Sequence, residues 1–154
     1  MKSLPLVGLA LALALTGIAC DNSSDTSSTT TATPVLVSET LTGTVNAPVG
    51  GVLQTASNLF TVASPGGPVS VTLTSAVLTN PDGTTNPAVV MGVTVGTQTG
   101  TTCTLGAGNT PVLLQASATS TISGSLAAGS YCVQVSDVTN QKGPVAYTVV
   151  VMHP

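Results

Sequence analysis

The chain has 154 residues, of which only 5% are charged and 2% are aromatic, and its formal net charge is −3. It contains no Arg, and its only lysines are Lys2 and Lys142. The clustered positive charge that binds phosphate backbones is therefore missing, which excludes a nucleic-acid-binding protein. Its apolar residues are mainly Val, Leu and Ala interleaved with Thr, Ser and Gly, a composition that favours β-strands.

Residues 1–19 have the organisation of an export signal. Lys2 and the amino terminus supply positive charge, and residues 4–15 form an apolar stretch that is too short to span a bilayer. Residues 17–19 then supply the small side chains that a signal peptidase requires before the cleaved bond. We therefore predict a signal peptide over residues 1–19 and an exported protein.

Cys20 directly follows the predicted cleavage site. The segment Ile18-Ala19-Cys20 resembles the lipobox of bacterial lipoproteins, in which the cysteine becomes the first residue and carries the lipid. Gly17 departs from that motif, which prefers Leu at this position, and Gly-x-Ala also suits the ordinary signal peptidase. Two interpretations follow: a lipoprotein with a palmitate-type anchor on Cys20, or a secreted protein with a free amino-terminal thiol.

Residues 20–34 are predicted to be a disordered tether. Residues 21–33 are almost wholly Ser, Thr, Asp and Asn, and such a segment cannot bury enough apolar surface to offset the entropy lost on ordering. A flexible tether is useful to a protein only if its far end is attached to something, and this favours a lipid on Cys20. That lipid would also leave an even pair of cysteines, Cys103 and Cys132.

Residues 35–154 alternate short apolar runs with Gly- and Pro-rich turn signals, and no stretch keeps a helical period over three turns. Strands that recur about every ten residues with such turns indicate an all-β domain, an antiparallel β-sandwich of jelly-roll or immunoglobulin-like type. The predicted strands are residues 35–45, 59–63, 69–74, 89–95, 112–118, 120–126, 131–135 and 145–151. The predicted turns are residues 64–68, 80–87, 106–111, 128–129 and 140–144.

The strand period of two predicts which side chains form the core. Three triplets of alternating residues are expected to point inward: Val69, Val71 and Leu73; Tyr131, Val133 and Val135; and Tyr147, Val149 and Val151. Their polar neighbours are expected to face water: Ser70, Thr72, Gln134 and Thr148. Cys132 is out of phase with its apolar neighbours, which predicts a place on the outer face or at a bulge. Gly92 and Gly96 indicate a close backbone approach or a bulge in their strand.

Cys103 and Cys132 are predicted to form a disulfide. Export places them in an oxidising compartment, where a disulfide is the normal state of a cysteine pair. No C-x-x-C spacing points instead to a metal site. Bridge geometry then requires their Cα atoms to lie within about 7 Å of each other.

No residue pattern indicates a catalytic site or a cofactor, and we expect no enzyme. His153 is the only histidine, no G-x-S-x-G motif accompanies it, and we interpret it as a strand-end residue. Asp82 lies in an Asn-Pro-Asp-Gly turn. Asp137 ends a strand, where it can cap the next turn or join a calcium site, although calcium needs six to eight oxygen ligands. The three aromatic residues alternate with apolar partners, which favours core positions over a sugar-binding platform.

A series of short motifs resembles the bacterial pre-peptidase C-terminal domain family. In chain order the motifs are Leu59–Val62, Val69–Thr74, Gly92–Thr97, Cys103, Gly129–Asp137 and Tyr147–Val151. The members of that family are β-sandwich modules attached to secreted peptidases and other exported proteins, and the resemblance covers residues 52–154.

The resemblance is most specific in one strand. The family's Gly-x-Tyr-x-Val-x-Val strand matches Gly129, Tyr131, Val133 and Val135, which are structural positions. The acidic residues that give some relatives calcium sites are mostly absent, and these 154 residues include no peptidase domain. The ligand binding and enzyme partnership of the family therefore do not carry over to this chain.

Together these observations predict a non-catalytic cell-envelope lipoprotein. Its parts are a signal peptide (1–19), a Ser/Thr-rich tether with lipidated Cys20 (20–34) and an accessory or adhesion-like β-sandwich (35–154). The expected partners are a membrane, through the lipid, and an envelope protein or polysaccharide. The alternative is a soluble secreted module that binds protein or polysaccharide.

Overall fold

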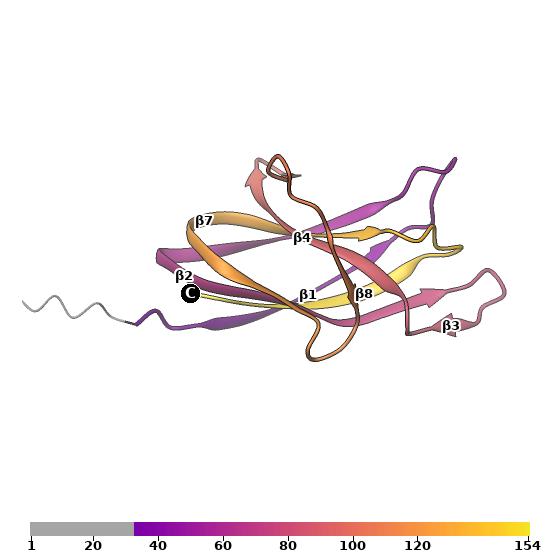
Figure 1. Cartoon of the computed structure of the whole chain (residues 1–154), viewed down its shortest axis with the longest axis horizontal. Coiled ribbons are helices and arrows are strands. Elements are labelled where there is room, and N and C mark those ends of the chain that lie inside the picture. Colours follow the sequence, from indigo (N-terminus) through magenta and orange to yellow (C-terminus); the bar gives the residue numbers. More distant parts are fainter. Residues whose placement is uncertain (1–32) are drawn as a thin grey trace, which may run out of the picture. The chain divides into compact units, whose positions relative to one another are not determined.

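The computed structural model describes residues 33–154, which form eight β-strands (Figure 1). This part of the chain contains no helix, and hence none long and apolar enough to cross a membrane. The strands are β1 (Val37–Val45), β2 (Thr55–Thr79), β3 (Thr85–Asn86), β4 (Val90–Thr99), β5 (Thr102–Thr104), β6 (Val112–Gln115), β7 (Thr121–Asp137) and β8 (Val145–His153). The predicted all-β class is confirmed.

All the strand pairs are antiparallel and belong to one sheet, in the order β1-β8-β2-β7-β4-β5. The short strand β3 pairs with β2, and β6 pairs with β4. The predicted antiparallel arrangement is therefore confirmed. Within the sheet, β1 lies at one edge and pairs with β8 from end to end, with Val37 opposite His153.

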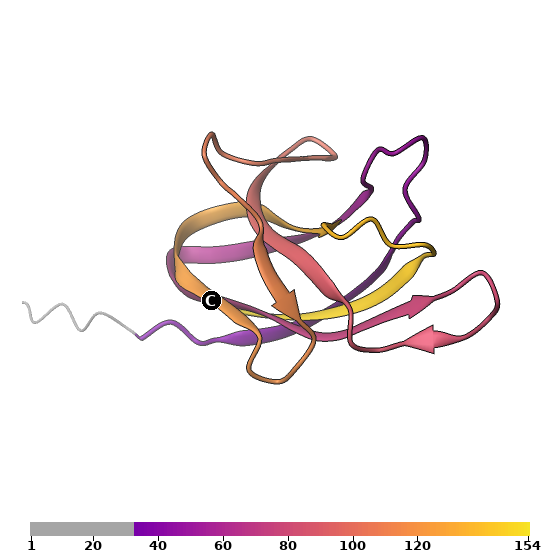
Figure 2. The same ribbon diagram turned by 45° about the vertical axis from the view of Figure 1, so that its right-hand side comes forward.

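Two long strands, β2 and β7, bend together and pair with each other on both sides of the bend. Residues 55–62 of β2 pair with residues 129–136 of β7, and residues 66–72 pair with residues 121–127. The register shifts between Val62 and Gly66. Figures 1 and 2 show β2 and β7 curving around the same end of the domain, close to the carboxyl terminus.

These bends replace two predicted turns, so the predicted strand boundaries were wrong there. The turn signals in the sequence predict a break in β2 at residues 64–68 and in β7 at residues 128–129, whereas each strand continues through those residues. Gly66 has a φ of 93°, and a Cβ built on it would lie 2.6 Å from the Leu126 carbonyl oxygen. Glycine is therefore required where this bend of β2 passes close to the backbone of β7.

The core collects the predicted triplets. Their buried members are Val69, Val71, Leu73, Val133, Val135, Tyr147, Val149 and Val151, and they join one cluster that also contains Val45, Phe60, Val62, Met91 and Val93. Tyr131 is only partly buried and packs against that cluster. The polar residues predicted to face water are partly buried rather than exposed: Ser70, Thr72, Gln134 and Thr148.

Candidate functional site

Cys103 of β5 and Cys132 of β7 form the predicted disulfide, with their Cα atoms 5.7 Å apart. The two strands are not hydrogen-bonded to each other, because β4 pairs with β7 on one side and with β5 on the other. The bridge therefore joins strands that β4 separates in the sheet order, and it holds the β4–β5 hairpin against β7.

Gly96 of β4 makes room for this bridge. It lies opposite Cys132 in the β4–β7 register. A Cβ built on Gly96 would lie 2.6 Å from the Thr104 carbonyl oxygen and 3.2 Å from Cys132 Sγ. Gly92, on the same face of β4, would similarly bring a Cβ to 2.5 Å from Ser136 Oγ. The register of this strand pair is regular, so the glycines serve a close approach and not a bulge.

Cys132 occupies the outer face of β7, one of the two places predicted for it. Its phase in the strand is opposite to that of Val133, which belongs to the core cluster, and the register contains no bulge there. Cys132 is nevertheless fully buried. The outer face is therefore closed to solvent at this point.

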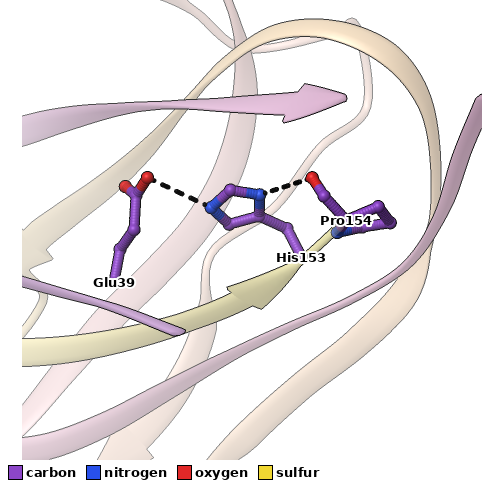
Figure 3. A network of polar contacts seen from close by, with 3 residues as sticks. All are labelled: Glu39, His153 and Pro154. Carbon is purple, nitrogen blue, oxygen red and sulfur yellow. Dashed lines mark hydrogen bonds and ion pairs between the residues drawn. The ribbon is translucent and has the colours of Figure 1, made fainter. Parts of the chain in front are cut away.

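His153 lies buried at the end of β8, between the start of β1 and the chain's last residue (Figure 3). Its Nδ1 is 2.9 Å from the Pro154 main-chain oxygen, so Nδ1 carries a proton and donates it. Its Nε2 is 3.3 Å from Glu39 Oε1, close enough for an ion pair but without the geometry of a hydrogen bond. The Phe60 ring lies 5.5 Å away, centroid to centroid.

His153 is the last residue of β8, which agrees with its interpretation as a strand-end residue. No Ser, Thr or Cys side chain in residues 33–154 makes a hydrogen bond with the imidazole. The polar contacts of the ring instead link the end of β8 to Glu39 of β1 and to Pro154.

The two carboxylate oxygens of Asp137 cap the turn that follows β7. Oδ1 accepts a hydrogen bond of 2.9 Å from the Thr139 N–H, and Oδ2 accepts one of 2.9 Å from the Gln141 N–H. The turn cap is one of the two roles predicted for this buried residue, and these two hydrogen bonds show it. Within the described range, no group of three His, Cys, Asp or Glu side chains could hold a metal ion.

Asp82 also serves a turn, but one that is fully exposed. Its Oδ1 accepts hydrogen bonds from the Thr84 hydroxyl at 2.7 Å and from the Thr84 N–H at 3.0 Å. The hydroxyl first, and then the N–H, hold the pKa of the Asp82 carboxyl below its ordinary value. Both contacts are local to the loop between β2 and β3, and they explain the turn signature in the sequence.

The aromatic side chains form no exposed platform in the described part of the chain. Phe60 and Tyr147 are buried, and Tyr131 is partly buried and stacks on Phe60 with the ring centroids 5.8 Å apart. The Tyr147 hydroxyl donates a 2.6 Å hydrogen bond to Asn58 Oδ1. Burial raises the pKa of this tyrosine above its ordinary value. The expectation that these three residues pack in the core is met by Phe60 and Tyr147 and only in part by Tyr131.

The candidate binding surface is a group of three hollows that share Val95 in their walls. Their volumes are about 320, 180 and 120 Å³. The smallest has an apolar lining, to which Ile122 and Leu126 of β7 contribute. The two larger hollows add Asn109 to the lining. None of the three is lined by a charged side chain.

A larger hollow of about 400 Å³ lies on the outer face of β1, β8 and β2, with Thr42, Thr44, Ser75 and Thr148 in its lining. That lining mixes these hydroxyl groups with Val77 and Ala146, whereas the smallest hollow beside Val95 has the predominantly apolar lining that ligand sites usually have. The hollows around Val95 are therefore the better candidate. The sequence predicts residues 120–126 only as a strand, and nothing in that pattern indicates a hollow beside it.

Cys20, the predicted signal peptide and nearly all of the tether lie outside the described residues. Comparisons with protein-family models, with curated proteins and with solved structures found no match for this chain.

Proposed function

We propose that this protein is a non-catalytic cell-envelope lipoprotein, anchored through a lipid on Cys20. The observation that carries the proposal is the Cys103–Cys132 bridge. The chain has three cysteines, so the bridge leaves Cys20 alone, directly after a segment that resembles a signal peptide. Disulfides are typical of exported proteins, and the bridged pair leaves no other cysteine of this chain with which Cys20 could pair.

We propose further that residues 35–154 fold as a β-sandwich. The bends in β2 and β7 support this, because they allow one sheet to fold over itself. One layer would contain β1, β8, the second part of β2 and the first part of β7; the other would contain the first part of β2, the second part of β7, and β4. The core cluster draws buried residues from both groups, among them Val149 and Val93. The pre-peptidase C-terminal domains that the sequence resembles have this architecture.

The function that we infer for the domain is accessory or adhesion-like binding to another envelope component. The chemistry-bearing side chains described above support a non-catalytic role, because His153 and Asp137 are engaged in strand-end and turn contacts. A protein partner fits better than a polysaccharide. The smallest of the hollows around Val95 has a mostly apolar lining. The single aromatic ring in the walls of the three hollows, Tyr131, is partly buried and stacks on Phe60, which leaves it less available for a sugar to stack on.

Metabolic labelling with a palmitate analogue tests the anchor. The wild-type chain should incorporate the label and should fractionate with membranes, and Cys20→Ser should do neither. Intact mass should show the loss of residues 1–19 and the added mass of acyl groups. A mature protein that begins at Cys20 without added lipid would instead support the alternative, a soluble secreted binding module, which Gly17 before the cleavage site favours.

A further inference from the structure

The first part of β7, residues 121–127, is an open sheet edge. It pairs with residues 66–72 of β2 on one side and with no described strand on the other, whereas the second part of β7 pairs with both β2 and β4. Ser123, Gly124 and Ser125 are exposed, and a Cβ built on Gly124 would meet no atom within 4 Å. The edge is therefore accessible along its centre.

Nothing in this edge prevents pairing with another strand. Proteins usually protect exposed edges with charged residues, prolines or bulges. Residues 121–127 contain no charged residue and no proline, and their register with β2 is regular. The adjacent apolar hollow of about 120 Å³ includes Ile122 and Leu126 in its lining, and both side chains are only partly buried.

The edge is also self-complementary. Its central residues are Ile122-Ser123-Gly124-Ser125-Leu126, so the order of residue types is the same in both directions. In an antiparallel pair centred on Gly124, that glycine would face its own copy and Ser123 would face Ser125. Ile122 would face Leu126, on the side of the apolar hollow. A two-fold interface requires this kind of self-complementary surface.

We propose that a second copy of this chain pairs with this edge, so that the two β7 strands join the sheets of both copies around a two-fold axis. The partner's Leu126 and Ile122 would then cover the apolar hollow beside Val95. The absence of charge along the edge means that two acidic chains can approach there without local repulsion. This inference is independent of the lipid anchor.

Cysteine cross-linking tests the predicted register. The full chain carrying Cys20→Ser receives Gly124→Cys, so that the new thiol is the only one outside the Cys103–Cys132 bridge. Directly opposed residues in an antiparallel pair have Cα atoms about 4.5 or 5.5 Å apart, and both separations suit a disulfide. Mild oxidation should therefore give covalent dimers.

The matched control is Ser57→Cys, an exposed position elsewhere on β2, which should remain monomeric under the same oxidation. Equal cross-linking of the two variants, or none at Gly124→Cys, would overturn the proposal. Both positions are solvent-exposed, so neither substitution disturbs the core.

Charge substitutions test the same pairing without a covalent bond, with the dissociation constant measured by sedimentation equilibrium. Ser123→Lys combined with Ser125→Lys places like charges opposite each other at two symmetric positions, and should weaken the dimer roughly tenfold or more. Ser123→Lys combined with Ser125→Glu places opposite charges there and should retain the dimer. A parent chain that stays monomeric, or a dimer that both variants leave unchanged, would refute the proposed edge.

Discussion

At the scale of single residues, the polar side chains of this domain mostly satisfy backbone groups. Asp137 is the clearest example, because each of its carboxylate oxygens accepts a hydrogen bond from a different N–H of the following turn. Asp82 caps an exposed turn, where its Oδ1 alone accepts both hydrogen bonds, one from the hydroxyl and one from the N–H of Thr84. The two aspartates therefore have one role in two environments, and burial decides what each contributes to stability.

Asp137→Asn should destabilise the domain by about 1 to 3 kcal/mol, because the new amide keeps one acceptor oxygen but turns its own N–H donors toward the other backbone N–H of the turn. Asp82→Asn, the matched control in the exposed turn, should change the free energy of unfolding much less. Urea unfolding of both variants measures the difference. Equal losses would mean that the turn after β7 does not depend on the carboxylate.

At the scale of strands, the period of two decides which side chains are buried. Val133 is fully buried between two polar or sulfur-bearing neighbours, Cys132 and Gln134. Thr72 lies on the opposite face of its strand from Val71 and Leu73, and its hydroxyl is 2.8 Å from the Thr121 hydroxyl. Alternation alone thus places Val133 on the core face of the sheet and Thr72 on its outer face.

Val133→Asp should unfold the domain, because it removes a buried apolar side chain worth about 1.5 to 3 kcal/mol and places an unpaired carboxylate in the core. Thr72→Asp keeps its side chain at the outer face and should lower stability far less. Thermal melts followed by circular dichroism separate the two. If the melting temperatures fell equally, the assignment of faces would be wrong.

At the scale of the whole domain, the disulfide is the one covalent link between distant strands in the described residues. It closes a loop across a sequence separation of 29 residues and fastens the β4–β5 hairpin to β7. Gly96 allows the bridge to form, since any larger residue there would collide with Cys132 and Thr104. The bridge therefore depends on glycine at position 96.

Cys103→Ser combined with Cys132→Ala should lower the free energy of unfolding by roughly 3 to 4 kcal/mol, because the denatured chain regains the entropy of the opened loop. Alanine is chosen at position 132 so that no hydroxyl is buried there. Wild-type protein unfolded in a reducing agent serves as the control and should lose a similar amount. A loss near zero in both cases would show that the bridge does not reduce the conformational entropy of the unfolded chain.

Several features of this protein follow from the sequence by itself. The alternation around Val71, Val133 and Val149 predicts the buried faces, and an even pair of cysteines predicts the bridge. The alternation is a local property of each strand, and the bridge follows from counting the cysteines. Side-chain direction in a strand repeats every two residues whatever the strand pairs with, and cysteines in an oxidising compartment pair by default.

Only the tertiary structure decided how the strands are joined and which surface remains open. Residues 64–68 carry strong turn signals, yet β2 bends there and continues, because β7 bends beside it and keeps both parts paired. The place of Gly96 under the bridge and the free edge around Gly124 depend in the same way on partners distant in sequence. A local pattern predicts the face of a strand, but its neighbours, its register and its exposed edge are set by long-range contacts that no single segment contains.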